Sequence, residues 1–363
     1  MSIELDSSAA VSNGAPGPPP PVVSIILSFW NEEANLPELI RRLRSVLGAL
    51  RAAGEIKQHE LVFVNDASTD RSEALIRDAA VGHDDIRLIN MSRKFGVSPC
   101  VLAGLERCSG DVAVYMDADL QDPPELIPRL IAAWRSEPEV GVVHTIRTER
   151  HGETILKRLI TKLGYAILRR ASTIDLPIEA GDFKLLSRTV MQHLVRMREK
   201  RPFMRAMVCW VGFKQKTVTY EREPRFSGET KFPILGLGVI RNFLDSAFIS
   251  FSDVPLRFAI VAGTAISFAS LLYIVWVLFE KLRGHNLPGW SAIMVALLFL
   301  GGVQLLCIGL QGLYISSIFL ETKWRPNYII NTTFGFQADS TESQPADERP
   351  ARAGHRALID RPG

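Results

Sequence analysis

The first 150 residues alternate between short apolar runs and longer stretches in which apolar side chains recur at helical spacing. The runs at 22–29, 61–64, 86–89, 112–116 and 140–146 are rich in β-branched residues and predict strands. The stretches at 36–47, 68–80, 97–108 and 124–134 predict helices, and 208–219 predicts one or two further strands. This alternation is typical of an α/β fold with a mostly parallel sheet and helices on both faces. Ligands bind beyond the carboxyl ends of such strands, so the polar residues after each strand are the candidates for function.

The last third of the chain is far more apolar than the rest. Residues 258–279 and 291–320 contain no charged side chain, and each stretch exceeds the roughly 20 residues that span a bilayer as a helix. We therefore predict two transmembrane helices within 255–321; buried core helices are the alternative, but they seldom run so far without a charge. The preceding residues, 233–254, predict an amphipathic helix in the membrane interface or an ordinary helix packed on the upstream domain.

Both ends of the chain are polar. Residues 1–21 are small and proline-rich and predict a disordered leader, and residues 333–363 predict a disordered tail. The leader lacks the basic and apolar regions of a signal peptide, so we expect a cytosolic N-terminus. Two spans would then place the tail in the cytosol as well, and we expect an integral protein of the cytoplasmic membrane. Lys281 and Arg283, in the short loop left outside, run against the positive-inside rule.

Charge and cysteine content exclude some classes of function. The 42 basic and 39 acidic residues leave a net charge of +3, too even a balance for a protein that binds nucleic acid through a basic face. The four cysteines form no CxxC pair and have no histidine at zinc-ligand spacing, so we expect reduced, inert thiols.

A pair of carboxylates follows the strand predicted at 112–116. Asp117 and Asp119 are two residues apart, so at the end of a strand they point the same way. Paired oxygen ligands suit Mg²⁺ or Mn²⁺, which would also hold a diphosphate. Most Asp-x-Asp pairs are solvated loop or helix-capping residues, but here a buried strand precedes the pair and Pro123-Pro124 starts a helix after it.

A second polar segment, Asn65-Asp66-Ala67-Ser68-Thr69-Asp70, follows the strand predicted at 61–64. Ser68 alone would explain it as a helix N-cap with Asp70 in the first turn. The functional alternative is that Asp66 accepts a hydrogen bond from a nucleobase.

Five motifs in order carry a resemblance to family 2 glycosyltransferases. They are Asn31-Glu32-Glu33, Asn65-Asp66-Ala67-Ser68-Thr69-Asp70, Asp117-Ala118-Asp119-Leu120-Gln121-Asp122-Pro123-Pro124, Ala180-Gly181-Asp182-Phe183 and Arg225-Phe226-Ser227-Gly228-Glu229-Thr230-Lys231. More narrowly, the chain is similar to bactoprenol glucosyltransferases and dolichol-phosphate mannose synthases. The likeness covers about residues 22–320 and includes the paired C-terminal spans. The resemblance implies a Rossmann-like GT-A domain at 22–232. It also implies inverting transfer of a sugar from a nucleotide sugar to a polyprenyl phosphate at the cytosolic membrane face.

The resemblance also implies roles for individual residues. Asp117, Asp119 and Gln121 correspond to the metal and diphosphate ligands, and Arg225 and Lys231 to residues that hold phosphate groups. Asp182 stands near the expected acceptor, as an orienting or basic group or simply as the partner of an arginine. The remaining candidates for donor or lipid-phosphate contacts are Asn31, Glu33, Asp66, Arg147, Lys157 and Arg158.

Some positions depart from the family pattern. Asn65 stands where aspartate is usual and Ala67 where glycine is usual, which affects the expected base contacts. UDP-glucose is the leading donor, with mannose, GlcNAc and aminoarabinose transfer as alternatives. A polysaccharide acceptor and a non-catalytic membrane scaffold also remain open. Members of the family often assemble as homo-oligomers, some of them tetramers. We expect a homo-oligomer here as well.

Overall fold

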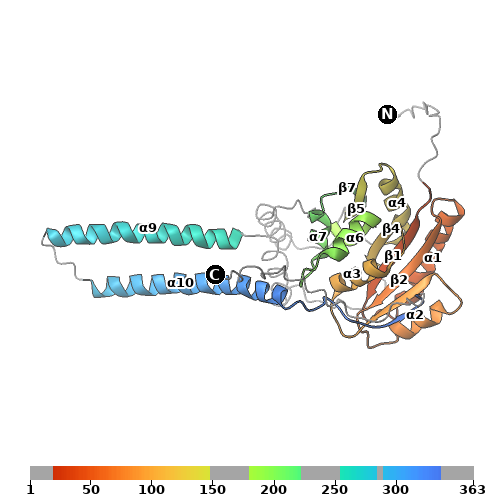
Figure 1. The fold of residues 1–363 in the computed structure, drawn as a ribbon, viewed down its shortest axis with the longest axis horizontal. Helices are drawn as coiled ribbons and strands as arrows, with labels where there is room; N and C mark the ends of the chain where they lie inside the picture. The colour runs from red at the N-terminus through yellow and green to blue at the C-terminus, as the bar shows by residue number, and fades with distance from the viewer. Residues whose placement is uncertain (1–18, 148–179, 222–253, 284–288, 337–363) are drawn as a thin grey trace, which may run out of the picture.

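An eight-stranded sheet forms the centre of the N-terminal domain and also includes one strand from near the end of the described chain. The computed structural model describes residues 19–147, 180–221, 254–283 and 289–336 (Figure 1). Across the sheet the strand order is β7-β5-β6-β4-β1-β2-β3-β8, in which only β6 and β8 run antiparallel to their neighbours. The strands are β1 (Val22–Phe29), β2 (Gln58–Asn65), β3 (Ile86–Met91), β4 (Val112–Asp117), β5 (Val140–Arg147), β6 (Ala180–Ser187), β7 (Lys214–Tyr220) and β8 (Ile330–Phe334).

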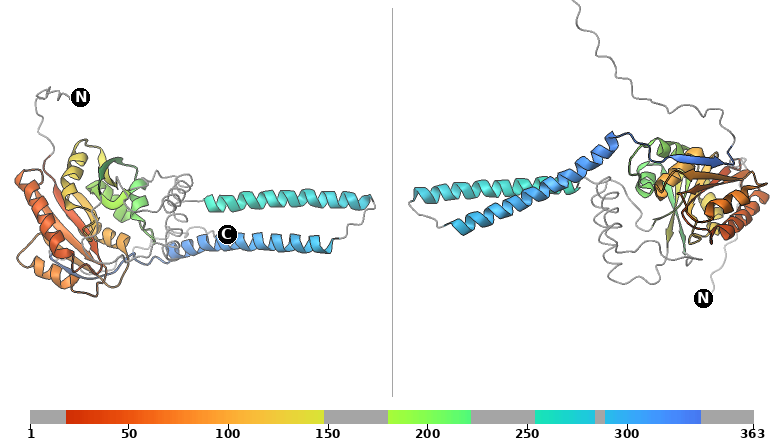
Figure 2. Two further views of the ribbon diagram at one scale, coloured as in Figure 1. Left: turned by 180° about the vertical axis from the view of Figure 1, so that it is seen from behind. Right: turned by 90° about the horizontal axis from the view of Figure 1, so that it is seen from below.

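Helices cover both faces of the sheet, as the sequence predicts (Figures 1 and 2). One face packs against α1 (Leu36–Ala52), α2 (Ser72–Ala80), the short helix η1 (Pro124–Leu126) and α4 (Ile127–Arg135). The other packs against α3 (Val97–Arg107), α6 (Arg188–Arg196) and α7 (Met204–Trp210). The central strand β1 is almost wholly buried because both faces are covered, which explains its unbroken apolar run.

The structure differs from the expected elements in several places, and β6 and α6 were not expected at all. The helix predicted from residue 68 begins at Ser72, because the residues before it form the loop after β2. Only the second part of 208–219 is a strand, β7, since residues 208–210 complete α7. Residues 333 and 334, expected to begin a disordered tail, instead belong to β8 at the edge of the sheet.

Two long helices, α9 (Val254–Leu282) and α10 (Trp290–Thr322), run side by side and project away from the sheet domain (Figures 1 and 2). Among the described residues one segment, Phe299–Thr322 of α10, has the length and apolar character needed to cross a membrane. The apolar part of α9, Gly263–Tyr273, is shorter. Two spans therefore stay a prediction, and the amphipathic segment predicted at 233–254 lies almost entirely outside the described residues.

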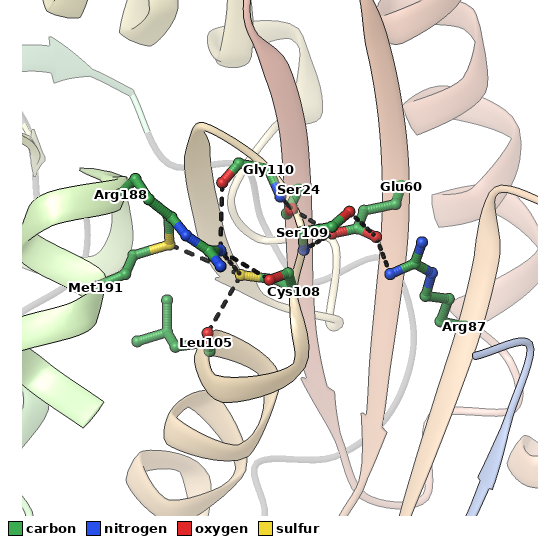
Figure 3. A network of polar contacts seen from close by, with 9 residues as sticks. All are labelled: Ser24, Glu60, Arg87, Leu105, Cys108, Ser109, Gly110, Arg188 and Met191. Carbon is green, nitrogen blue, oxygen red and sulfur yellow. Dashed lines mark hydrogen bonds and ion pairs between the residues drawn. The ribbon is translucent and has the colours of Figure 1, made fainter. Parts of the chain in front are cut away.

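A polar cluster fastens the amino-terminal edge of the sheet, opposite the candidate site (Figure 3). The buried carboxylate of Glu60 accepts from Ser24 Oγ at 2.5 Å and from the Ser109 backbone N–H at 2.6 Å. It also forms an ion pair with Arg87. On the other side of the turn before β4, Arg188 donates to the carbonyl of Cys108 at 2.8 Å. This cluster joins β1, β2, β3 and the turn before β4, so we assign it a structural role.

Candidate active site

Two loops interlock at the carboxyl edge of the sheet, one after β1 and one after β2. Asn31 Oδ1 accepts from the Thr69 backbone N–H at 2.8 Å, and Asn31 Nδ2 donates to Thr69 Oγ1 at 3.1 Å. Glu33 Oε2 accepts from the backbone N–H of Arg71 at 3.1 Å. The structure thus brings Asn31 and Glu33 to the expected edge, where these side-chain oxygens hold one loop to the other.

Asp66 clamps a third loop, between β3 and α3. Its carboxylate accepts from the backbone N–H groups of Phe95 at 2.6 Å and Gly96 at 2.9 Å, and its side chain is buried. The next residue, Ala67, has a φ of 56°, a left-handed conformation that glycine adopts without strain. This explains physically why glycine is the usual residue there. Asp66 therefore shapes the edge where we expect a nucleobase, and contact with the base stays a prediction.

The end of β4 and the strained loop that follows it carry three aspartates. Leu120 is buried and has a φ of 59°, which is rare for a leucine and is typical of functional loops that the surrounding structure holds in place. The turn is closed by Asp119 Oδ1, which accepts from the Gln121 backbone N–H at 3.1 Å. Asp117, at the end of β4, is largely covered by its neighbours, and Asp119 is buried.

Carboxylates crowd around Asp117. Burial, followed by the charges of Asp182, Asp119 and Asp122, raises the pKa of Asp117 to about 8, against a partial lowering by Arg205. A group held in this way releases its proton readily when a cation arrives. The cluster is therefore a place where positive charge is strongly favoured.

The aspartates suit a divalent cation that shares its ligands with a substrate. In the described part of the chain, no three His, Cys, Asp or Glu side chains are arranged to hold a metal by themselves. Mg²⁺ is commonly bound through one or two carboxylates, with substrate phosphates and water completing its shell. Asp117 and Asp119 fit that pattern, with Gln121 beside them as a neutral oxygen donor.

Arg147 reaches the same loop from the end of β5. Its Nε donates to the Tyr220 hydroxyl at 3.2 Å, and its Nη2 lies 3.7 Å from the buried carboxylate of Asp122. The Tyr220 hydroxyl also donates to Asp122, and burial together with Asp122 raises the pKa of Tyr220 to about 12. A Cβ on Gly181 would lie 3.0 Å from Arg147 Nη2, so the glycine leaves room for the guanidinium.

Asp182 forms an ion pair with Arg205. Arg205 donates from Nε at 2.9 Å and from Nη2 at 2.5 Å to the two carboxylate oxygens. Burial would raise the pKa of Asp182, but the hydrogen bonds and charge of Arg205 outweigh it and lower the pKa. Asp182 is consequently an anion beside Asp117, and the arginine partner considered in the sequence analysis is present.

Sequence reasoning missed three residues of this arrangement. Asp122 lay inside a quoted motif but received no role, whereas Tyr220 and Arg205 carried no signal of their own. Of the residues predicted to hold phosphate groups, the structure describes only Arg147. The other four lie outside the described residues: Lys157, Arg158, Arg225 and Lys231.

Comparisons with known proteins agree with this geometry. Residues 24–195 match the family model described as glycosyl transferase family 2, and residues 254–318 match the GtrB C-terminal hairpin. The chain is 38% identical to the uncharacterized glycosyltransferase YkcC of Bacillus subtilis (strain 168), over 86% of this chain and 94% of that protein. It is 34% identical to the bactoprenol glucosyl transferase of Shigella phage SfX, over 85% of this chain and 99% of the relative.

Among solved structures, the mannosyltransferase PcManGT from Pyrobaculum calidifontis, in complex with GDP-Man and Mn²⁺, is 18% identical. The match covers 85% of this chain and 89% of that one, with a TM-score of 0.43. A likeness at this level says nothing about the ligands of this chain.

Proposed function

The chain belongs to glycosyltransferase family 2, and on that premise we propose that it transfers glucose from UDP-glucose to a polyprenyl phosphate, with inversion. The observation that carries the proposal is the gathering of Asp117, Asp119 and Arg147 at the carboxyl edge of the sheet. It occurs in a chain whose next segment matches the GtrB hairpin. Relatives at 33–35% identity that are named bactoprenol glucosyl transferases support glucose and the lipid acceptor.

In the proposed reaction an oxygen of the lipid phosphate forms a bond to the anomeric carbon of the sugar. The bond from that carbon to the diphosphate breaks, UDP leaves, and polyprenyl-monophosphate glucose is the product. A phosphate monoester is largely ionised near neutral pH, because its second pKa is about 6, so little help from a general base is needed. The ion pair with Arg205 supports a role for Asp182 in orienting the acceptor rather than in deprotonating it.

Charge builds up on the departing diphosphate, so stabilising that charge is the main catalytic task. A bound Mg²⁺ or Mn²⁺ would neutralise part of it. Asp117 and Asp119 would hold the ion, with Gln121 beside them. Arg147 carries a positive charge into the same loop, and we extend the phosphate-binding role to Lys157, Arg158, Arg225 and Lys231 on the family pattern.

The membrane arrangement is part of the proposal. We propose that α9 and α10 both span the cytoplasmic membrane, with the sheet domain on the cytosolic side and 233–254 in the interface. The exposed apolar side chains along α10, such as Leu305 and Ile315, support burial in lipid or against other copies of the chain. Assembly as a homo-oligomer, with a tetramer as the first state to test, would cover part of this surface.

The test is transfer of label into lipid. Detergent-purified protein is incubated with undecaprenyl phosphate, Mg²⁺ and a panel of labelled UDP- and GDP-sugars, and label is followed into the organic phase. We expect label from UDP-glucose alone, lost with EDTA and in Asp119→Asn. Asp84→Asn, an exposed aspartate away from the site, is the matched control and retains activity.

The other outcomes identify the alternatives. Label from a different donor would change the sugar, and label in a water-soluble glycan would point to a polysaccharide acceptor. Nucleotide binding without transfer from any donor would favour a non-catalytic scaffold. Full activity of Asp119→Asn in a folded protein would remove the proposed metal site.

A further inference from the structure

The strand that follows the membrane hairpin returns to the sheet next to the loops of the candidate site. After α10 the chain enters β8, which pairs antiparallel with β3 at the edge of the sheet (Figure 2, right). Thr332 pairs with Asn90 in this register, and Asn90 lies opposite Asn65 in the pairing of β2 with β3. Three polar residues from three adjacent strands therefore stand in one row.

Hydrogen bonds connect this row into a relay. Asn90 Nδ2 donates to Thr332 Oγ1 at 2.9 Å, and Asn65 Nδ2 donates to Asn90 Oδ1 at 2.9 Å. Asn65 Oδ1 in turn accepts from the backbone N–H of Ser68 at 2.9 Å. The relay thus runs from the exit of the membrane hairpin to the loop after β2.

Asn90 is the centre of the relay. Its Nδ2 also donates to Glu73 Oε1 of α2 at 3.0 Å, so both amide protons and the carbonyl are used. Asn90 and Asn65 are both buried, where an amide group that loses its partner is costly. Among the described residues Asn65 Nδ2 donates only to Asn90, so Asn90 and the Ser68 N–H together fix the orientation of the Asn65 amide.

The loop that Asn65 supports is the one in which Ala67 takes a left-handed conformation and Asp66 clamps the loop after β3. A left-handed alanine persists only where surrounding contacts hold it. The bond from Asn65 to Ser68 spans this alanine and is one such contact.

We propose that Asn90 and Thr332 are positioning residues through which the strand leaving the membrane hairpin holds the nucleotide-binding loop in shape. This inference rests on the proposed function in one respect: it takes the ligand of the loop to be the nucleotide part of a nucleotide sugar. Attachment of the hairpin to the sheet and affinity for the donor are then linked through a few hydrogen bonds.

The test uses UDP binding, which needs no turnover. Full-length protein in detergent is titrated with UDP and Mg²⁺ by calorimetry, and KM is measured separately for donor and lipid. We expect Asn90→Ala to weaken UDP binding about tenfold, and Thr332→Val about threefold, since it removes one acceptor from an exposed strand. The donor KM should rise in step, with the lipid KM unchanged.

The neighbouring threonine supplies the control. Thr333 lies on the opposite face of β8, so Thr333→Val makes the same chemical change without touching the relay. Thr332→Ser keeps the hydroxyl and should restore binding. If Asn90→Ala does not fold, the three threonine variants still decide the question.

Two results would overturn the proposal: unchanged UDP affinity in Thr332→Val, even with a lower unfolding temperature, or equal losses in Thr332→Val and Thr333→Val. The first would mean that β8 only stabilises the sheet. Failure of the proposed function looks different. If the lipid acceptor is wrong, UDP still binds and responds to these variants while no lipid product forms. If the donor is wrong, the unaltered protein itself does not bind UDP.

Discussion

Breaking the ion pair between Arg205 and Asp182 should impair transfer much more than it impairs folding. In Arg205→Ala the carboxylate of Asp182 loses two charge-assisted hydrogen bonds, of 2.9 and 2.5 Å. Such bonds each contribute about 1.5–3 kcal/mol when well shielded. The side chain of Arg205 is 38% exposed, so we discount the total to about 2 kcal/mol, or about a 30-fold loss of turnover at pH 7.

The same change has a pH signature. Arg205 lowers the pKa of both Asp182 and Asp117, so in its absence both carboxyl groups hold their protons to higher pH. The acidic limb of the activity profile should therefore move toward higher pH, with partial recovery of turnover as pH rises. Arg205→Lys keeps the charge but not the paired donors. Its turnover and the position of its acidic limb should therefore fall between those of the unaltered protein and Arg205→Ala.

The assay is lipid transfer across pH 6–9, with unfolding temperature measured in parallel. Arg196→Ala, an exposed arginine on α6, is the matched control and should behave as the unaltered protein. A double variant with Asp182→Asn should be no worse than Asp182→Asn alone, because the two residues act as a unit. A loss below threefold in Arg205→Ala, or losses that multiply in the double variant, would refute this reasoning.

Three further predictions concern stability. Lys184 is fully buried, and among the described residues its Nζ has no hydrogen-bond partner; burial lowers its pKa from 10.5 to about 8. Between pH 8 and 10.5 the folded state therefore binds fewer protons than the unfolded state. The free energy of unfolding falls by about 3 kcal/mol as the pH drops from 10.5 to 8. Lys184→Met should raise the unfolding temperature more at pH 7.5 than at pH 10; equal changes would contradict the assignment. Ala67→Gly should relieve the left-handed strain and stabilise the protein by about 0.5–1 kcal/mol, seen as a higher unfolding temperature; a lower one would show that the turn is not strained. Glu60→Gln should cost about 3 kcal/mol of stability, because Arg87 loses its charged, buried partner. Transfer measured at low temperature should be unchanged, because the cluster lies at the far edge of the sheet. A selective loss of transfer would instead link that edge to the site.

The alternation of strands and helices was predictable because its physical cause is local. Buried parallel strands need unbroken apolar runs, and helices that cover them need apolar side chains at 3.6-residue spacing, so β1 and α1 are evident from their residues alone. The family of the chain was predictable for a related reason, since the motifs sit at fixed places after the strands. The family matches confirm that assignment.

Pairing between distant segments was not predictable. Strand β8 is short, polar and separated from its partner β3 by most of the chain, including α9 and α10, so only the free edge of the sheet makes it a strand. Residues 208–210 carry β-branched and apolar side chains, but packing against β6 places them in α7. Local preference is weak compared with burial in both cases.

By itself, the sequence determined the strands β1 to β5 with the helices between them, the two long apolar segments, and the position of Asp117 and Asp119 at a carboxyl edge. Only the tertiary structure decided that Arg205 pairs with Asp182, that Asp122 holds Arg147 and Tyr220, and that the last strand reaches Asn90. Those contacts join residues 23 to 242 positions apart in the chain. Periodicity reports which face of an element is buried, but not which charged or polar partner the fold will bring to it.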